Sequence, residues 1–228
     1  MDQELSEQQV AMATRAVTGL EKTAANTPLN DFVTSIAQDL KIQQRRHSEL
    51  NTLGANLVGK PAPTFELMSL KEQTLAAADH KGKIVVLHFW KYASEPLEEP
   101  YGQVGYLDFL NNKRKRLGVK VYGIAVNDRL SDPSQKSKAL RSIRKLREFM
   151  NLSYDVTIDN GDVLNSFGDP REVGGKLPLW VVIDAAGTVS HYHAGFHEVD
   201  RRAGLKKLDD VVVDLIQKQR SKKANATN

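Results

Sequence analysis

Two dense apolar runs dominate the pattern of hydrophobic and polar positions along the chain. Residues 84–89 read Ile-Val-Val-Leu-His-Phe, and residues 119–126 read Val-Lys-Val-Tyr-Gly-Ile-Ala-Val. Runs of this length between turn-forming residues predict central strands that are buried on both faces of a sheet. Further along, the apolar stretch 180–183 and the more polar stretch 188–193, Thr-Val-Ser-His-Tyr-His, flank Asp184-Ala-Ala-Gly187. This arrangement predicts an antiparallel hairpin.

Apolar residues at helical spacing occur between and after these strands. They run over 97–117 and 205–217, and a basic amphipathic stretch covers 137–150. Strands that alternate with helices, followed by a terminal hairpin and helix, predict an α/β sheet covered on both faces. We therefore place the sheet domain at residues 57–217.

The first 50 residues show no strand pattern and predict two helices. Thr27-Pro28-Leu29-Asn30-Asp31 provides a capping hydroxyl, a proline at the first helical position and an acid in the first turn. The stripe that follows must pack on the sheet domain or on a second copy of the chain; it consists of Leu29, Phe32, Val33, Ile36 and Leu40. We expect residues 1–56 to be a helical extension with a linker at 51–56, and residues 218–228 to be a disordered basic tail.

Charge and hydropathy limit the partners of the chain. The formal net charge is +4, with basic clusters at 113–116, 141–147 and 218–223. The two internal clusters lie on expected amphipathic helices, where charge marks the solvated face, so we expect no nucleic-acid partner. No apolar stretch reaches the roughly 20 residues of a membrane span. The start lacks a basic and apolar signal sequence, which favours the cytoplasm as the chain stands, or an exported location if a leader has been removed.

Four motifs in one order carry a family resemblance. They are Gly59-x-x-Ala-Pro63-x-Phe65, Lys81-Gly-Lys83 before the strand that ends in Phe89-Trp90, Pro178, and Ile183-Asp184-x-x-Gly187. Together they resemble the thioredoxin-like superfamily, and within it the TlpA-like branch, which is also grouped with the redoxins and peroxiredoxins. The similarity covers residues 57–217. It implies a thioredoxin-like α/β fold, a central mixed sheet flanked by helices, here with an N-terminal helical extension, and it makes Pro178 the cis-proline that faces the active site.

The usual chemistry of this family conflicts with the composition, because the chain contains no cysteine. In the family, Phe-Trp precedes a Cys-x-x-Cys pair at a helix N-terminus, where the helix dipole lowers the pKa of the first thiol. Ser94 and Leu97 stand at those two positions here. A serine hydroxyl does not ionise near neutral pH without a base, and leucine has no reactive group. Thiolate catalysis is therefore not expected, and we predict no catalytic residue and no cofactor.

Binding is the function that remains for this surface. We predict a redox-inactive domain that binds a peptide or protein partner in the groove facing Pro178, where a cis bond would expose neighbouring backbone for strand-like pairing. The residues expected to form the groove are Trp90, Tyr92, Ser94, Glu95, Lys176, Leu177 and Pro178. The N-terminal helices offer a homodimer surface as a further partner prediction.

An oxidoreductase whose chemistry comes from a metal, a cofactor or a partner's thiol is the alternative. His191 and His193 lie two apart on a strand and point to the same side, so they are weak metal candidates, with His197 just beyond. Exposed strand histidines are the simpler interpretation of this pattern, and we expect no metal. Hydrolysis by Ser94 would need a base, and His88 on a buried strand is expected to be a core histidine.

Overall fold

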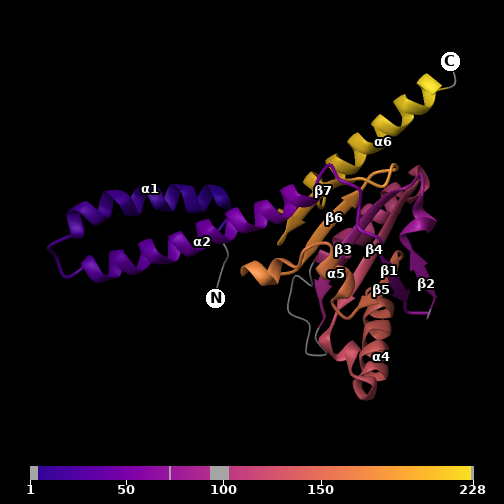
Figure 1. The fold of residues 1–228 in the computed structure, drawn as a ribbon, viewed down its shortest axis with the longest axis horizontal. Coiled ribbons are helices and arrows are strands. Elements are labelled where there is room, and N and C mark those ends of the chain that lie inside the picture. The colour runs from indigo at the N-terminus through magenta and orange to yellow at the C-terminus, as the bar shows by residue number, and fades with distance from the viewer. Residues whose placement is uncertain (1–4, 72, 93–102, 227–228) are drawn as a thin grey trace. The chain divides into compact units, whose positions relative to one another are not determined.

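The computed structural model describes residues 5–71, 73–92 and 103–226 (Figure 1). The described chain divides between Leu53 and Gly54 into two compact units. Ser94, Glu95 and Leu97 lie outside the described residues.

The first unit is a pair of helices, α1 (Glu7–Ala24) and most of α2 (Asn30–Leu57). Ser6 begins α1 with a capping box: its hydroxyl accepts from the Gln9 N–H at 3.2 Å, and the Gln9 side chain accepts from the Ser6 N–H at 2.8 Å. The two helices share a small core of Val10, Val17, Ala24, Val33 and Leu40. Val33 and Leu40 thus confirm part of the predicted stripe. Leu29 and Phe32 instead remain 63% and 66% exposed.

The linker expected at residues 51–56 is helical in the structure, because α2 continues without interruption to Leu57. A single glycine costs only about 1 kcal/mol in a helix interior, which the surrounding turns tolerate. Gly54 also has a packing reason to be there. A Cβ at this position would lie 3.1 Å from the Tyr192 ring, so the absence of a side chain permits the close approach.

The second unit contains a seven-stranded mixed sheet of order β2-β1-β5-β4-β3-β6-β7. Strand β3 pairs parallel with β4 and antiparallel with β6, and β6 pairs antiparallel with β7. These pairings confirm the predicted central strands, the terminal hairpin and the mixed sheet. The strands are β1 (Glu66–Ser69), β2 (Thr74–Ala76), β3 (Ile84–Lys91), β4 (Val119–Val126), β5 (Asp155–Asp159), β6 (Leu179–Ile183) and β7 (Val189–Ala194).

Helices cover the sheet as the sequence predicts. They are α3 (Val104–Arg114), α4 (Pro133–Phe149), α5 (Asp162–Ser166) and α6 (Lys206–Ala226), with short 3₁₀ turns at 77–80, 115–117, 128–131 and 170–173. Asp132 caps α4 by accepting from the Ser134 N–H at 2.9 Å, and Pro133 occupies the first helical position. Within the described residues, no helix combines the length and apolar character that crossing a membrane requires.

The C-terminal segment differs from its predicted disorder, since α6 continues to Ala226. Lys, Arg, Gln and Ala are strong helix formers, so a polar composition does not oppose the helix. The Gln219 side chain also donates to the Gly82 carbonyl at 2.8 Å. Part of the expected tail is therefore an extension of a packed helix.

Alternation along the central strands builds a core on each face of the sheet. Val86 and Trp90 of β3 belong to the cluster packed against α3, α4 and α6. Leu87 and Phe89 belong to the opposite cluster, with Phe65 and α5. Successive strand residues point to opposite faces, so a continuous apolar run is what burial on both faces requires. The cores on both faces thereby hold the ends of β3 and β6 in place, and we call these two strand ends the platform.

Candidate binding site

The strand register places Pro178 at the carboxyl end of β3. Phe89 of β3 pairs with Leu179 of β6, so Pro178 lies just beyond that pair, next to the point where β3 leads toward residues 93–102. The Leu177–Pro178 peptide bond is cis, as the resemblance implies. The Pro178 carbonyl accepts a hydrogen bond from the Gly195 N–H at 2.7 Å, which fixes the turn against the end of β7.

The backbone before Pro178 is open. Lys176 is exposed and Leu177 half-buried, whereas Pro178 itself is buried. The N–H groups of Lys176 and Leu177 donate to no backbone group in the part of the chain that the structure describes. Backbone donors without an internal partner need water or a ligand, so this short stretch can pair with an added strand.

Trp90 and Tyr92 take a different place from the one predicted for them. They are 2% and 6% exposed, and their rings pack edge to face with centroids 5.4 Å apart. The Tyr92 hydroxyl hydrogen-bonds the Ser142 hydroxyl of α4, and its N–H donates to the Val126 carbonyl at 3.1 Å. Both residues belong to the core between the sheet and the helices, because Trp90 points to that face of β3. They pack in the core beneath the ends of β3 and β6 and do not line a groove.

A histidine cluster (His191, His193 and His197) lies beside this platform. The ring centroids of His193 and His197 are 4.2 Å apart, and His191 lies 6.3 Å from His193 and 6.0 Å from His197. His197 also meets the edge of the Trp180 ring, whose face stacks on His88 at 3.8 Å. His88 is fully buried, as predicted. The cluster is buried or half-buried, in contrast to the exposed strand histidines considered from the sequence.

Burial keeps the cluster neutral near neutral pH. It lowers the pKa of His191 to about 4, with a further contribution from His193. The pKa of His197 falls to about 2 through burial and then through the neighbouring histidines. Burial also lowers the pKa of His193, against a hydrogen bond to the Phe196 carbonyl that raises it. Neutral imidazoles can bind metals, yet no group of three or more His, Asp or Glu residues within the described ranges could hold a metal ion.

Gln103 connects the cluster to the start of α3, and sequence reasoning missed it. Its amide donates to the His197 carbonyl at 2.6 Å and accepts from the His197 N–H at 2.9 Å. Both residues are buried, and Gln103 has a left-handed φ of 65° directly before Val104. A lone glutamine carries no sequence signal for such a two-sided contact. Gln103 therefore links the start of α3, by hydrogen bonds, to the segment that follows β7.

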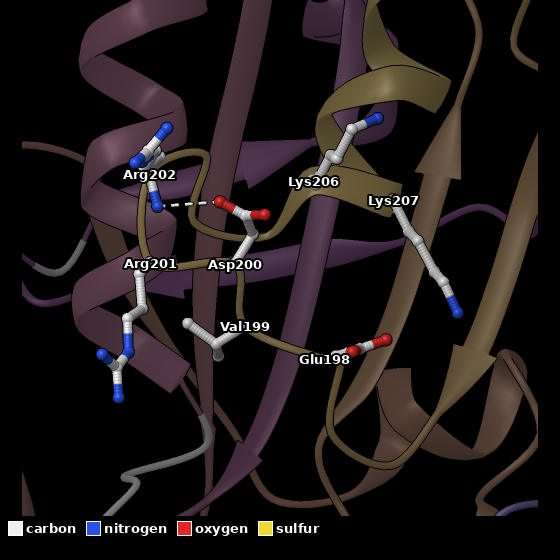
Figure 2. Close-up of a pocket in the computed structure, with 7 residues that line it drawn as sticks. All are labelled: Glu198, Val199, Asp200, Arg201, Arg202, Lys206 and Lys207. Carbon is white, nitrogen blue, oxygen red and sulfur yellow. Dashed lines mark hydrogen bonds between the residues drawn. The ribbon is translucent and has the colours of Figure 1, made fainter.

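Sequence reasoning also missed a surface cavity of about 560 Å³ formed by residues 198–207. Figure 2 shows its lining, which combines four cations with two acids and one apolar residue: Arg201, Arg202, Lys206, Lys207, Glu198, Asp200 and Val199. The basic clusters noted from the sequence were elsewhere. The signal available was Arg201-Arg202 close before Lys206-Lys207, two pairs that only the turn between them brings together.

Comparisons with known proteins agree with this architecture. The sequence profile of the AhpC/TSA family matches residues 58–192. The thiol-disulfide oxidoreductase ResA of Geobacillus kaustophilus is 32% identical over 139 residues, which are 60% of this chain and 70% of that protein. ResA of Bacillus thuringiensis is 28% identical over 156 residues, covering 66% and 78% of the two chains. A solved thiol:disulfide interchange protein of the thioredoxin family, from Chlorobium tepidum, superposes with a TM-score of 0.52 at 20% identity, covering 69% of this chain and 96% of the other. The fold is thioredoxin-like.

Proposed function

The chain belongs to the AhpC/TSA family, and from that membership we propose that it is a redox-inactive member that binds an extended peptide segment of a protein partner in the groove facing Pro178. The sequence holds no cysteine, so no thiolate can attack a disulfide or a peroxide. The described part of the framework, the end of β3 and the cis turn at Pro178, is present all the same. Binding needs that framework and does not need the thiols.

The observation that carries the proposal is the open backbone of Lys176 and Leu177. An extended peptide that adds to a sheet gains main-chain hydrogen bonds, and these require unpaired donors and acceptors at an accessible edge. Lys176 is exposed, and its N–H and that of Leu177 have no backbone acceptor among the described residues. Affinity of this kind depends on the backbone, so it survives replacement of nearby side chains.

Rigid support for the groove favours the same function. The Pro178 carbonyl is bound by Gly195, and Trp90 and Tyr92 are packed beneath the end of β3. A surface that is already ordered loses little conformational entropy when a ligand binds. The packed platform therefore supports recognition without chemistry.

A second partner surface is proposed on the first unit, where the chain associates with another copy of itself. Leu29 and Phe32 are 63% and 66% exposed beside the turn between α1 and α2. Large apolar side chains of this kind gain most from burial against a second apolar surface. Sedimentation of the wild type and of Leu29→Asp/Phe32→Asp tests this: a dimer that becomes a monomer is the expected result, and a wild-type monomer at all concentrations contradicts it.

The groove is tested with a peptide display library selected on the wild-type protein. Calorimetry then compares the wild type with Lys176→Pro, which lacks the N–H donor, and with Lys176→Ala, which keeps it. We expect at least a tenfold loss of affinity for the proline variant and less than a twofold change for the alanine variant. Equal binding by all three proteins, or the failure of selection, contradicts the proposal.

Two further measurements on the wild-type protein serve as controls for this test. Amide resonances of Lys176 and Leu177 in the wild type should shift on peptide addition, which does not depend on the folding of any variant. Reduction of insulin disulfides and consumption of peroxide should both be absent for the wild type. Turnover in either assay would contradict the redox-inactive assignment.

A further inference from the structure

The start of α6 carries charge of an unfavourable sign. Lys206 and Lys207 are the first two residues of this 21-residue helix, and Arg201 and Arg202 lie just before it. The N-terminus of a helix has partial positive charge, so acids stabilise it and cations do not. The two lysines of the first turn oppose the stability of the isolated helix, and the two arginines before it add to the same concentration of cations, which points to a role outside the folded chain.

Two of the nearby acids, Asp200 and Asp209, hydrogen-bond to groups other than these four cations. Asp209 faces Arg114 at 2.7 Å and Lys113 at 2.8 Å. The Asp200 carboxylate accepts the backbone N–H groups of Arg202 and Ala203 at 2.7 and 2.8 Å. The hydrogen bonds of these two acids therefore go to groups other than the four cationic side chains, while the hydrogen bond to Asp210 and then the charges of these two acids raise the pKa of nearby Lys206.

One cation of the four is paired. Lys206 donates to the Asp210 carboxylate at 2.5 Å. Within the described residues, Arg201, Arg202 and Lys207 have no ion pair. Three exposed cations are thus available to an acidic ligand.

These cations surround a shaped surface. Figure 2 shows the two arginines on one side of the cavity and the two lysines on the other, with Asp200 between them. The cavity of about 560 Å³ is large enough for several side chains of a partner. Glu198 and Asp200 place negative charge within the same lining.

Exposed apolar side chains occur in and near the cationic turn. Val199 lines the cavity and is 36% exposed, and Phe196, three residues earlier in the chain, is 51% exposed. Tyr106 and Phe109 of α3 are 40% and 49% exposed. Both pack by Gly204, where a Cβ would lie 3.4 Å from Phe109 and 3.9 Å from Tyr106. We call residues 196–207, together with Tyr106 and Phe109 that pack on Gly204, the 196–207 surface.

We propose that the 196–207 surface docks an acidic segment of a protein partner that also carries apolar side chains. Its carboxylates would meet Arg201, Arg202 and Lys207, and its apolar residues would meet Phe196 and Val199. A small inorganic anion would leave these apolar side chains unused. A nucleic acid would bring its evenly charged phosphates against Glu198 and Asp200, which a peptide of mixed sequence avoids.

The surface is independent of the groove, although the two are neighbours. The hydrogen bond between Gly195 and Pro178 places the start of the 196–207 surface beside the groove. Its lining includes neither Lys176 nor Leu177. One partner can occupy both surfaces, yet each can be disabled separately.

The test uses a fluorescein-labelled 14-residue peptide in which Glu and Asp alternate with Leu and Phe, measured by anisotropy at low ionic strength. The variant is Arg201→Glu/Arg202→Glu. The matched control is Arg141→Glu/Lys145→Glu, the same charge change on exposed positions of α4. We expect at least a tenfold loss of affinity for the variant and less than twofold for the control. The same peptide with Gln and Asn in place of its acids should not bind the wild type.

Lys207→Glu supplies a readout that a structural role would not move. This variant should lower the affinity for the acidic peptide at least fivefold. It should also raise the melting temperature of the protein, because an acid replaces a cation at the positive end of α6. Lys176→Pro should leave peptide affinity unchanged, which separates this proposal from the groove.

Three outcomes overturn the proposal. One is equal loss of affinity in the variant and the α4 control. Another is no binding of the acidic peptide to the wild type at millimolar concentration. The third is a single-stranded oligothymidylate that binds more tightly than the peptide and responds to the same substitutions, which would assign the surface to nucleic acid.

Discussion

The end of β6 and the start of α6 are two candidate binding surfaces of one domain, and they are built on different principles. Around Pro178 the recognition groups are backbone N–H groups on a packed platform, with Lys176 the exposed residue. Around Lys206 and Lys207 they are charged side chains on a helix end that does not favour them. Binding at the first surface would depend on backbone groups, which the absence of cysteine leaves in place, whereas binding at the second would depend on side chains.

The largest expected effect concerns the acid that anchors the start of α6. Burial raises the pKa of Asp209, but hydrogen bonds from Arg114 and Lys113 outweigh this and lower it below the usual value. Asp209→Ala leaves Arg114 without its partner in a half-buried position, and we expect a loss of about 3 kcal/mol in the free energy of unfolding. The control is Asp210→Ala, which removes an exposed ion pair and should lower the stability far less. Urea denaturation measures both, and similar losses would contradict the distinction.

The second prediction concerns the histidine cluster, which lies between the two surfaces. The folded pKa values of His191, about 4, and His197, about 2, are below the unfolded value of about 6.5. The unfolded chain therefore binds more protons below pH 6.5. Stability from this source is full above pH 6.5 and falls as the pH drops, by up to about 1.4 kcal/mol per pH unit for each histidine.

The measurement is the free energy of unfolding from urea titrations between pH 7.5 and 5. His191→Gln/His193→Gln should flatten the decline. A wild-type stability that rises toward pH 5 would contradict the burial of neutral imidazoles.

A third prediction concerns the connection between the surfaces. The Gln103 amide holds both backbone groups of His197. Gln103→Ala leaves a buried carbonyl and a buried N–H without partners, and we expect a loss of about 2 kcal/mol. Faster amide exchange should appear in residues 194–199 and not in β4. If residues 194–199 exchange their amide hydrogens at the same rate in the variant and in the wild type, the Gln103 contact does not hold this segment.

The fold could be predicted because its signals are local and repeated. The apolar runs 84–89 and 119–126 required burial on both faces, and the structure places them at the centre of the sheet. The prediction of a linker at 51–56 is wrong, because a single glycine breaks a helix only weakly when the residues around it favour helix. The close contact between Gly54 and Tyr192 cannot be inferred from the sequence.

The candidate site could be predicted only in its backbone. Pro178 was identified by its motif, and its cis bond is confirmed. Trp90 and Tyr92 were placed in the groove because they flank the expected loop, yet strand alternation and the Ser142 contact turn them into the core. Gln103 and the residues 201–207 gain their meaning from segments that meet only in the folded chain, so no local pattern identifies them.

The smallest expected effect separates the two surfaces most sharply. Lys207→Gln removes one cation from the first turn of α6 without adding an acid, so the free energy of unfolding should rise by only about 0.3 to 0.5 kcal/mol. Affinity for a peptide selected on the groove should stay within twofold, because recognition there uses the backbone. Affinity for an acidic peptide should fall two- to threefold, with a weaker dependence on salt, because one charge contact is lost. The measurements are thermal melts at two salt concentrations and the two peptide affinities. Together they distinguish a helix end whose charges serve folding from one whose charges serve binding of a partner.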